Sequence, residues 1–446
     1  MKLTLDPGAA ALLDTLHAAG YAAYAVGGCV RDLLLDRRPG DWDITTAARP
    51  EEVLSLFAPQ AAATGLKHGT VTVFEGAASF EVTTFRLDGT YADHRHPDAV
   101  TFSDSLAEDL KRRDFTVNAI AMDQAGEITD LFGGREDLAR GVLRCVGRPE
   151  QRLEEDALRI MRALRFSSVL GFSLAPETAD AVFQGKSLLR EVAVERVREE
   201  LLKLLCGRCV VPALLQYAEV LGVVLPEILP AVGCDQRNIH HCYDVWEHIA
   251  RTVGFVPPDA VLRMTMLLHD LGKPGTMTVD EDGTGHFRGH ADVSCTLGKT
   301  ILERLRFDKE STRRILTLVQ WHDVPIERTP KAMRRLLHKL GEKGVRDLLQ
   351  VKRADNLAQA SAYHGRQGQI DTLEALLQQA LEQDACFTLR QLAVNGRDLL
   401  EQGYRGREVG AALQFMLDAV IDGTLPNEKQ ALLKVLSTEF ASNATE

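Results

Sequence analysis

The sequence predicts an α/β head with a small mixed sheet, followed by a long all-helical part. Short apolar runs separated by glycine-containing turns are confined to roughly the first third of the chain. From about residue 150 onward, apolar residues recur at helical spacing instead, as in Leu158, Met161 and Leu164. The length of 446 residues allows two to four domains.

The predicted elements follow one another in a simple order. An amphipathic helix ends at Gly20, a strand follows, and a glycine pair separates this strand from a second helix. A second strand comes next, and two further strands flank the turn 75–78 as a hairpin. The ranges are 9–20 and 30–35 for the helices, and 21–26, 41–44, 70–74 and 80–85 for the strands. Pro257-Pro258 and the segment 280–285 are predicted loops in the helical part.

Composition excludes some classes of protein. The chain is 45% hydrophobic and 26% charged, which is typical of a globular protein with a buried core. Acidic residues interrupt the apolar N-terminal stretch, and no run approaches the ~20 apolar residues of a membrane span. These features predict a cytoplasmic protein without a membrane partner. The net charge of −11 argues against a wholly basic surface, but a local basic groove around Lys111-Arg112-Arg113 stays compatible with it.

Eight cysteines occur without the spacing of a disulfide framework. Cys206 and Cys209 form a lone CxxC pair with no second pair nearby. Zinc binding at this pair is an alternative, but free thiols in a reducing compartment are the favoured interpretation.

The most informative segment follows the first predicted strand. It reads Gly27-Gly28-Cys29-Val30-Arg31-Asp32 and continues to Asp41-Trp42-Asp43. A glycine pair between strand and helix lets backbone N–H groups approach a triphosphate, and the helix N-terminus favours anions. Asp41 and Asp43 are two residues apart on a predicted strand, so both carboxylates are expected on one face. Two such oxygen ligands suit Mg²⁺ and metal-assisted phosphoryl chemistry.

A surface turn with two solvated aspartates is the plain alternative for this segment. The upstream glycine turn and the downstream segment 111–116, which reads Lys-Arg-Arg-Asp-Phe-Thr, favour a functional site instead. Glu81 on a later strand is a further candidate carboxylate.

A second polar pattern lies in the segment Glu155–Phe166. Asp156, Arg159, Arg162 and Arg165 are three residues apart, which predicts a polar stripe on one helix face. A carboxylate and a guanidinium one turn apart present acceptors and donors to a base edge, and further arginines hold phosphates. An ion-paired, solvated helix face is the alternative.

Together these motifs resemble the class II tRNA nucleotidyltransferase and bacterial poly(A) polymerase family, most closely the CCA-adding enzymes. The resemblance covers residues 21–205 almost without gaps and reappears near the C-terminus. It rests on Val26-Gly-Gly-Cys-Val-Arg-Asp, Asp41-Trp-Asp-Ile-Thr-Thr, Lys67-His-Gly-Thr-Val, Phe80-Glu-Val-Thr-Thr-Phe-Arg, Arg112-Arg-Asp-Phe-Thr-Val-Asn-Ala-Ile-Ala-Met, Asp130-Leu-Phe-Gly-Gly, the Glu155–Phe166 segment, Leu392-Ala-Val-Asn-Gly-Arg-Asp and Gly403-Tyr-Arg-Gly.

The resemblance implies a nucleotidyltransferase head (1–144), a helical neck (145–205), a helical body (206–365) and a tail that binds tRNA (366–446). Asp41 and Asp43 would be the catalytic Mg²⁺ ligands. Asp156 and Arg159 would pair with the base of CTP or ATP, so that protein specifies the nucleotide. The triphosphate would be held by Gly27, Gly28, Arg31 and Arg112, and the base site would be supported by Arg162 and Arg165.

The segment 86–98 resembles the flexible loop that the family needs for switching from CTP to ATP. Its presence favours full CCA addition to the tRNA 3′ end. Poly(A) polymerases share most of these motifs, so poly(A) or A-only addition stays open. In the tail, Arg397, Arg405 and Arg407 are compatible with an RNA path.

The helical body carries a second set of candidate ligands. Imidazoles and aspartates scattered over antiparallel helices can converge on a divalent transition metal and activate water for phosphoester hydrolysis. The series resembles the HD phosphohydrolase superfamily, which implies a core of His248, His269, Asp270 and Asp355, with His290 and His322 at a second metal position. Mn, Ni, Fe and Zn are the candidate ions. His94, His96, His240, His241 and His286 are predicted loop or surface residues, with His286 close to this site.

Two functions from different classes therefore stand beside each other. The first is template-independent nucleotidyl transfer to RNA, with an HD-type hydrolase as a possible second activity. The alternative is an HD-type metal-dependent hydrolase whose head is inactive, against which the intact Asp41/Asp43 pair and the Asp156/Arg159 stripe speak. The sequence indicates no oligomeric state.

Overall fold

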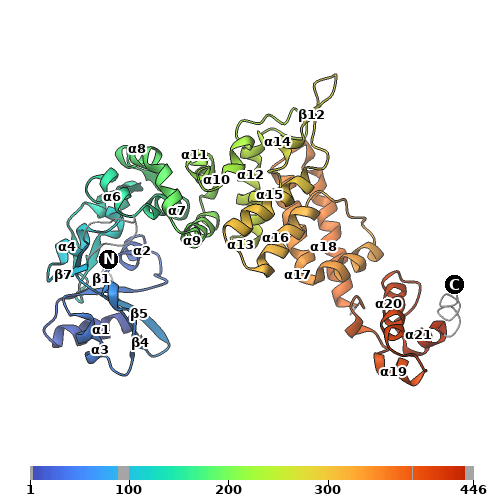
Figure 1. The fold of residues 1–446 in the computed structure, drawn as a ribbon, viewed down its shortest axis with the longest axis horizontal. Coiled ribbons are helices and arrows are strands. Elements are labelled where there is room, and N and C mark those ends of the chain that lie inside the picture. Colours follow the sequence, from blue (N-terminus) through green and yellow to red (C-terminus); the bar gives the residue numbers. More distant parts are fainter. Residues whose placement is uncertain (1–3, 89–99, 384, 437–446) are drawn as a thin grey trace. The chain divides into compact units, whose positions relative to one another are not determined.

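The computed structural model describes residues 4–88, 100–383 and 385–436. The chain divides into two compact units, which are described separately (Figure 1). The first unit contains residues 1–229 and 304–306, and the second contains 230–303 and 307–446.

The first unit is built on a seven-stranded mixed sheet in the order β3-β4-β5-β2-β1-β8-β9. β2 and β5 are parallel, and their neighbours in the sheet are antiparallel. The predicted small mixed sheet is thus confirmed. Its strands are β1 (Ala23–Val26), β2 (Asp43–Thr46), β3 (Ala61–Gly65), β4 (Thr70–Glu75), β5 (Ala78–Thr84), β8 (Ile120–Met122) and β9 (Ile128–Asp130), and two small pairs add β6 (Arg86–Asp88) with β7 (Val100–Phe102) and β10 (Val142–Leu143) with β11 (Ser173–Leu174).

The two faces of this sheet have different roles. Alternation along β2 and β5 directs Ile44, Phe80 and Val82 into an apolar core that α1 and α3 cover. Asp43 and Glu81, their neighbours in sequence, therefore face the opposite side. That side carries the helices α2 and α4, and the functional carboxylates lie there. The helices of the head are α1 (Pro7–Ala18), α2 (Gly28–Leu34), α3 (Pro50–Leu56), α4 (Leu106–Lys111) and α5 (Gly134–Arg140), with the 3₁₀ turn η2 (Thr116–Asn118).

Two expectations for the head need correction. The second strand begins at Asp43, so Asp41 precedes it and lies in an exposed bend rather than on the strand. The switching loop predicted at 86–98 begins in β6, and residues 89–99 lie outside the described residues. The hairpin around 75–78 is confirmed, because β4 and β5 pair from Thr70↔Thr83 to Glu75↔Ala78.

The helical part of the first unit departs from the predicted single helix at Glu155–Phe166. α6 ends at Glu155, Asp156 is extended (φ −139°, ψ 101°), and α7 begins at Leu158. The Asp156 carboxylate accepts a hydrogen bond from the Leu158 N–H (3.1 Å), and this local bond competes with a continuous helix. The helices are α6 (Pro149–Glu155), α7 (Leu158–Leu170), α8 (Pro176–Gly185), α9 (Val194–Leu205), α10 (Val210–Gln216) and α11 (Ala218–Leu221).

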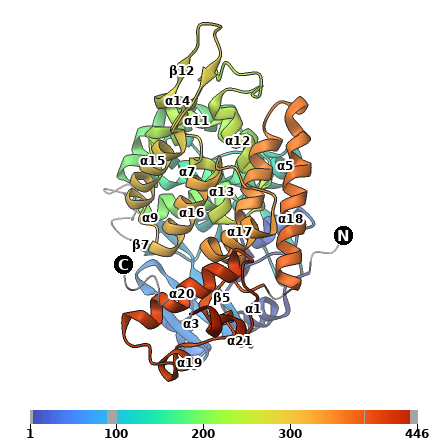
Figure 2. The same cartoon turned by 90° about the vertical axis from the view of Figure 1, so that its right-hand side faces the viewer.

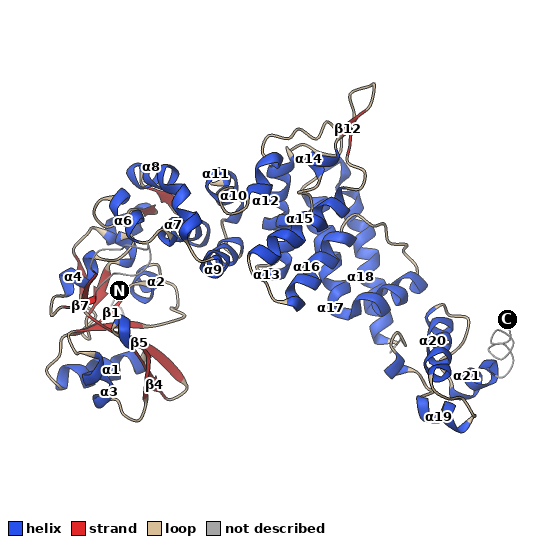
Figure 3. Ribbon diagram, in the orientation of Figure 1, coloured by secondary structure: helices blue, strands red, loops and turns tan. Residues whose placement is uncertain are grey.

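The second unit is helical, as predicted. Figure 3 shows strand β12 among its helices, and α17 and α18 run side by side in Figure 2. The hairpin, β12 (Thr278–Val279) with β13 (Gly285–His286), frames the predicted loop 280–285. The helices are α12 (Val245–Phe255), α13 (Ala260–Leu268), α14 (Lys273–Thr276), α15 (His290–Arg304), α16 (Lys309–Trp321), α17 (Pro330–Leu357), α18 (Gln367–Glu382), α19 (Gly396–Glu401), α20 (Arg407–Ile421) and α21 (Lys429–Val435). Among the described residues, no helix combines the length and apolar character needed to cross a bilayer.

Gly207, between the two cysteines of the CxxC pair, packs directly against the end of α7. A Cβ at Gly207 would lie 2.1 Å from Ser168 Oγ and 2.7 Å from the Ser168 carbonyl carbon. We therefore expect Gly207→Ala to lower the free energy of unfolding by about 1–3 kcal/mol, the usual cost of overpacking. Urea denaturation checks this. Gly40→Ala is the matched control, because a Cβ at Gly40 meets nothing within 4 Å; equal losses in the two variants would contradict the packing explanation.

Candidate functional site: a carboxylate face in the head and a histidine cluster in the body

The glycine turn of the head lies directly over Asp43. β1 ends at Val26, Gly27 has a left-handed φ of 81°, and α2 begins at Gly28. A Cβ at Gly27 would lie 3.0 Å from Arg113 Nη1 and 3.9 Å from Asp43 Oδ2. Both the backbone conformation and the close approach therefore require glycine at this position. The turn, the carboxylate and the guanidinium form one compact group.

Three carboxylates share this side of the sheet. Asp43 and Glu81 are direct partners in the parallel β2–β5 pair. Burial is the main cause that raises the pKa of Asp43 above its ordinary value, and the negative charges of Glu81 and Asp41 raise it further. Arg113 and Arg162 act in the opposite direction but do not reverse the shift. The carboxylates of Asp43, Glu81 and Asp41 are thus close enough to influence one another, and this donor set fits a divalent cation with oxygen ligands.

Arg113 is the functional candidate that the sequence analysis missed. Arg112 donates two hydrogen bonds to Asp109 Oδ1, at 2.9 and 2.7 Å. Arg113 also contacts Asp109 (3.3 Å), but its Nη1 lies beside Gly27 and its charge acts on Asp43. The only sequence signal was the doubled arginine before Asp114, which does not reveal which of the two side chains turns toward the glycine turn.

Asp114 joins the head to the arginines of α7. The Asp114 carboxylate is buried and accepts hydrogen bonds from Asn118 Nδ2 (3.0 Å) and Arg162 Nε (2.7 Å). Asn118 Oδ1 in turn accepts a hydrogen bond of 2.7 Å from Arg31 Nη1. Although burial alone would raise the pKa of Asp114, Arg162 and Asn118 hold it well below the usual carboxyl range. Two predicted nucleotide-binding arginines, Arg31 and Arg162, are therefore fixed through one carboxylate.

An aromatic ring holds the same arginines from the other side. The guanidinium carbons of Arg31, Arg162 and Arg165 lie 5.2, 5.4 and 4.0 Å from the centroid of the Phe166 ring. Arg165 also pairs with Glu200 (3.1 Å), and burial, together with the neighbouring Arg162, lowers the pKa of Arg165 to about 10. The three predicted arginines therefore converge.

The predicted base-reading pair is arranged differently from a helical stripe. Asp156 lies in the break between α6 and α7, within 3.5 Å of Arg196. Arg159 Nη1 pairs with Glu155 (2.8 Å), and its Nη2 donates to the Arg112 carbonyl (3.0 Å). Asp156 and Arg159 are close in the chain, but in this structure each has a different partner.

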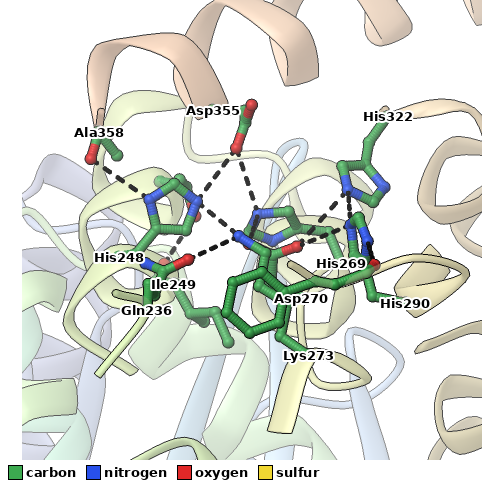
Figure 4. Close-up of polar contacts among 12 residues, drawn as sticks. Gln236, His248, Ile249, His269, Asp270, Lys273, His290, His322, Asp355 and Ala358 are labelled. Carbon is green, nitrogen blue, oxygen red and sulfur yellow. Dashed lines mark hydrogen bonds and ion pairs between the residues drawn. The ribbon is translucent and has the colours of Figure 1, made fainter. Parts of the chain in front are cut away.

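The body brings its predicted ligands together in two groups that share Asp270. In the first, the candidate ligand atoms of His248, His269, Asp270 and Asp355 lie within 4.8 Å of one another. In the second, those of Asp270, His290 and His322 do. Figure 4 shows Asp270 between the two groups, with Asp355 reaching in from α17. Asp270 is 3.2 Å from His248 Nε2 through Oδ2 and 3.3 Å from His290 Nε2 through Oδ1.

The carboxylate of Asp270 in this cluster is surrounded by positively charged or protonatable groups. Burial would raise the pKa of Asp270, but His269 and Lys273 hold it well below the usual range, with Lys273 Nζ 2.6 Å from Oδ2. Burial would likewise lower the pKa of His269, and Asp270 instead raises it to about 9. Within the described residues, the buried His269 Nε2 and Asp270 oxygens have charged neighbours at 2.6–3.3 Å, but none of these contacts has hydrogen-bond geometry. Such a set of N and O donors fits a divalent transition metal.

The histidine cluster opens into a cavity of about 310 Å³. His240, His241 and His286 line it; His240 and His241 lie in loop segments, as predicted, and His286, which was expected near the cluster, lies in β13. Burial lowers the pKa of His241 to about 3, and its ring lies edge-on to His248 at 5.3 Å. Lys273, Arg288 and Arg366 add positive charge to the wall. His94 and His96 lie outside the described residues.

Comparison with known proteins gives consistent matches along the chain. Residues 23–144 match the family model "Poly A polymerase head domain", and residues 291–436 match "tRNA nucleotidyltransferase domain 2". The CCA-adding enzyme of Lactobacillus helveticus is 37% identical over 427 residues, covering 95% of each chain. That of Geobacillus stearothermophilus is 53% identical over 216 residues, which is 48% of this chain and 53% of that enzyme.

Solved structures match over nearly the whole length as well. The crystal structure of the Bacillus stearothermophilus CCA-adding enzyme in complex with CTP has a TM-score of 0.74 at 34% identity, covering 99% of this chain and all of that one. The Thermotoga maritima CCA-adding enzyme complexed with tRNA has a TM-score of 0.54 at 20% identity, which supports a shared fold only.

Removal of the Asp114 carboxylate should separate the arginines of α7 from the head. We expect Asp114→Ala to lower the free energy of unfolding by about 3–5 kcal/mol, because it leaves Arg162 partly buried without its anion. Because the folded pKa is lowered, this stabilisation is present at neutral pH and begins to be lost as the pH falls below about 4. Urea denaturation between pH 7 and pH 3 measures both effects. Asp180→Ala, on the exposed side of α8, is the control; a loss as small as the control's would refute the central role of Asp114.

Proposed function

We propose that this chain, which belongs to the family of CCA-adding enzymes, adds C, C and A to the 3′ end of tRNA from CTP and ATP. The observation that carries the proposal is the position of Asp43 below the Gly27 turn, beside Glu81 and Arg113. In the reaction, the RNA 3′-hydroxyl attacks the α-phosphate of the nucleotide. A new phosphodiester bond forms, the bond to the β-phosphate breaks, and pyrophosphate leaves.

Asp41 and Asp43 would hold Mg²⁺ at this site. When bound, Mg²⁺ supplies activation of the attacking hydroxyl and neutralisation of the pyrophosphate leaving group. The mutual influence of Asp41, Asp43 and Glu81 on one another supports this assignment, and the register of β2 with β5 makes Glu81 the candidate for a third carboxylate. Gly27 and Gly28 let the triphosphate approach the backbone, and Arg31 and Arg112 offer guanidinium groups to it, with Arg113 as an added contact.

Asp156 and Arg159 are proposed to read the base. Bonds to Glu155 and to the Arg112 carbonyl hold the Arg159 guanidinium group, which has five N–H donors in all. Arg162 and Arg165 support the site from their positions around Phe166. We further propose the division into a head (1–144), neck (145–205), body (206–365) and tail (366–446), and a cytoplasmic location.

Substitution of either metal-binding aspartate should abolish nucleotide addition. We expect Asp41→Ala and Asp43→Ala each to reduce it to on the order of one thousandth of the wild-type rate or less, since both ligands act on the charge of the transition state. A tRNA lacking CCA is incubated with CTP and ATP, separately and together, and the product lengths are read on a gel. Glu75→Gln, at the far end of β4, is the control.

The product lengths also separate the related activities. Addition that stops after CC without ATP and finishes with one A supports CCA addition. Long A tails on unrelated RNA would indicate a poly(A) polymerase, and substantial activity in Asp43→Ala would refute the metal assignment.

For the body we propose a second, HD-type site that hydrolyses phosphoesters at RNA ends. The supporting observation is the pair of ligand groups that share Asp270, with buried donor atoms that lack hydrogen bonds. A divalent metal held there would supply a bound hydroxide as nucleophile. The cavity cations Lys273, Arg288 and Arg366 would bind the phosphate of the substrate.

This second activity should depend on metal and on Asp270. We expect hydrolysis of bis-p-nitrophenyl phosphate to be stimulated by Mn²⁺ or Ni²⁺ and to be lost in Asp270→Ala, because that substitution removes the ligand common to both groups. The release of p-nitrophenol measures hydrolysis, and elemental analysis of the same protein samples measures the bound metal. Asp418→Ala on α20 is the control. Failure of every divalent metal to give hydrolysis would reduce the cluster to a structural element.

A further inference from the structure

A cavity of about 770 Å³ in the second unit is not used by either proposed site. It lies between α15, α16 and the middle of α17, and shares no lining residue with the histidine cavity. Leu316, Leu318 and Trp321 of α16 and Leu340 of α17 supply apolar walls. Its volume is in the range of small-molecule sites, which are mainly apolar with a few convergent polar groups.

The cavity is shaped by a glycine kink in α17. Gly341 has φ 68° and ψ 170°, which interrupts the helix and favours glycine. Leu340 and Gly344, on either side of the kink, both line the cavity, and Gly344 contributes no side chain to fill it. The opening therefore arises from a specific backbone feature of the sequence.

The polar groups of the wall fall into two sets. Inside, Arg314 Nη2 donates to Asp347 Oδ2 (3.0 Å), and these side chains are 25% and 11% exposed, so a donor and an acceptor stand side by side. At the rim, Arg313, Lys339 and Lys343 are exposed cations, faced by the single exposed carboxylate of Glu310. This local excess of positive charge contrasts with the net charge of −11 of the chain.

We propose that this cavity binds a mononucleotide. The base lies in the apolar part, beside Trp321, whose ring also has the Lys339 ammonium 4.4 Å from its centroid. The Arg314–Asp347 pair offers a donor and an acceptor to the base edge, and the rim cations bind the phosphates. An apolar ligand would leave the rim cations unmatched and the Arg314–Asp347 pair without a polar partner in the ligand.

A free nucleotide fits better than an RNA strand because the basic rim does not continue along α17. The next cations on that helix are already paired: Lys331 and Arg335 with Asp422, and Arg346 with Glu342. The positive charge available to phosphates thus ends at the cavity, which suits one nucleotide and gives no track for a backbone.

Equilibrium dialysis of the full chain with radiolabelled ATP and Mg²⁺ tests the proposal. We expect the wild type to bind one more ATP per chain than Arg313→Glu/Lys343→Glu, which reverses two exposed rim charges. Lys299→Glu/Lys309→Glu is the matched control, because it makes the same charge change on α15 and α16 outside the cavity, and it should bind ATP as the wild type does. Trp321→Leu should weaken the additional site roughly tenfold.

Both proteins have the same head, so the difference in ATP binding between wild type and rim variant does not depend on the proposed nucleotidyl transfer. The rim variant should extend tRNA at the wild-type rate. Equal ATP binding by the wild type and the rim variant would overturn the proposal. The proposal would also fail if the rim variant lost binding to a short single-stranded RNA but bound ATP as the wild type does. That result would assign the surface to RNA.

Discussion

The buried carboxylate of Asp114 is the interaction on which the proposed nucleotide site of the first unit depends. It follows the arginine pair of the head in sequence and accepts hydrogen bonds from Asn118 in the head and Arg162 in α7. Since Asn118 also binds Arg31, one buried anion fixes cations from two helices that are more than a hundred residues apart. A buried carboxylate is expensive unless it is paired, and here its pairing requires the head and the neck helix to pack in one way.

Charge balance explains why the remaining groups lie where they do. Near the Gly27 turn, Asp43, Asp41 and Glu81 contribute negative charge, while Arg31, Arg162 and Arg165 surround Phe166. A nucleotide bound to Mg²⁺ carries positive and negative charge. Its Mg²⁺ ion would pair with the carboxylates, and its phosphates would pair with the guanidinium groups. The head therefore needs no basic surface over the whole chain, which agrees with a net charge of −11.

Much of this site was predictable because its parts are local in sequence. The glycine turn and the hairpin are each determined within a few residues, and the sheet confirmed the hairpin, whereas Asp41 precedes the strand predicted to carry it. The errors arose where local rules compete or where packing decides. The Asp156 side chain accepts a hydrogen bond from the Leu158 N–H, and the helix that apolar periodicity predicted is interrupted there. Arg112 turned to Asp109 and Arg113 to the glycine turn, a choice that only the position of α4 determines. His240 and His241 lie in loop segments, as predicted, but nothing in their sequence context reveals that they line a cavity.

In the second unit, α16 connects the histidine cluster with the neighbouring cavity. Trp321, its last residue, lines the larger cavity, and His322 follows immediately and reaches Asp270 at 3.6 Å. His322 is held by a hydrogen bond between its Nδ1 and the Val319 carbonyl (2.6 Å), so the ring moves with the last turn of the helix. Lys352 of α17 donates a hydrogen bond to the His322 carbonyl (2.8 Å) and so connects α17 with the end of α16. Trp321 and His322 are adjacent residues, so the last turn of α16 contributes both to the wall of the larger cavity and to the histidine cluster.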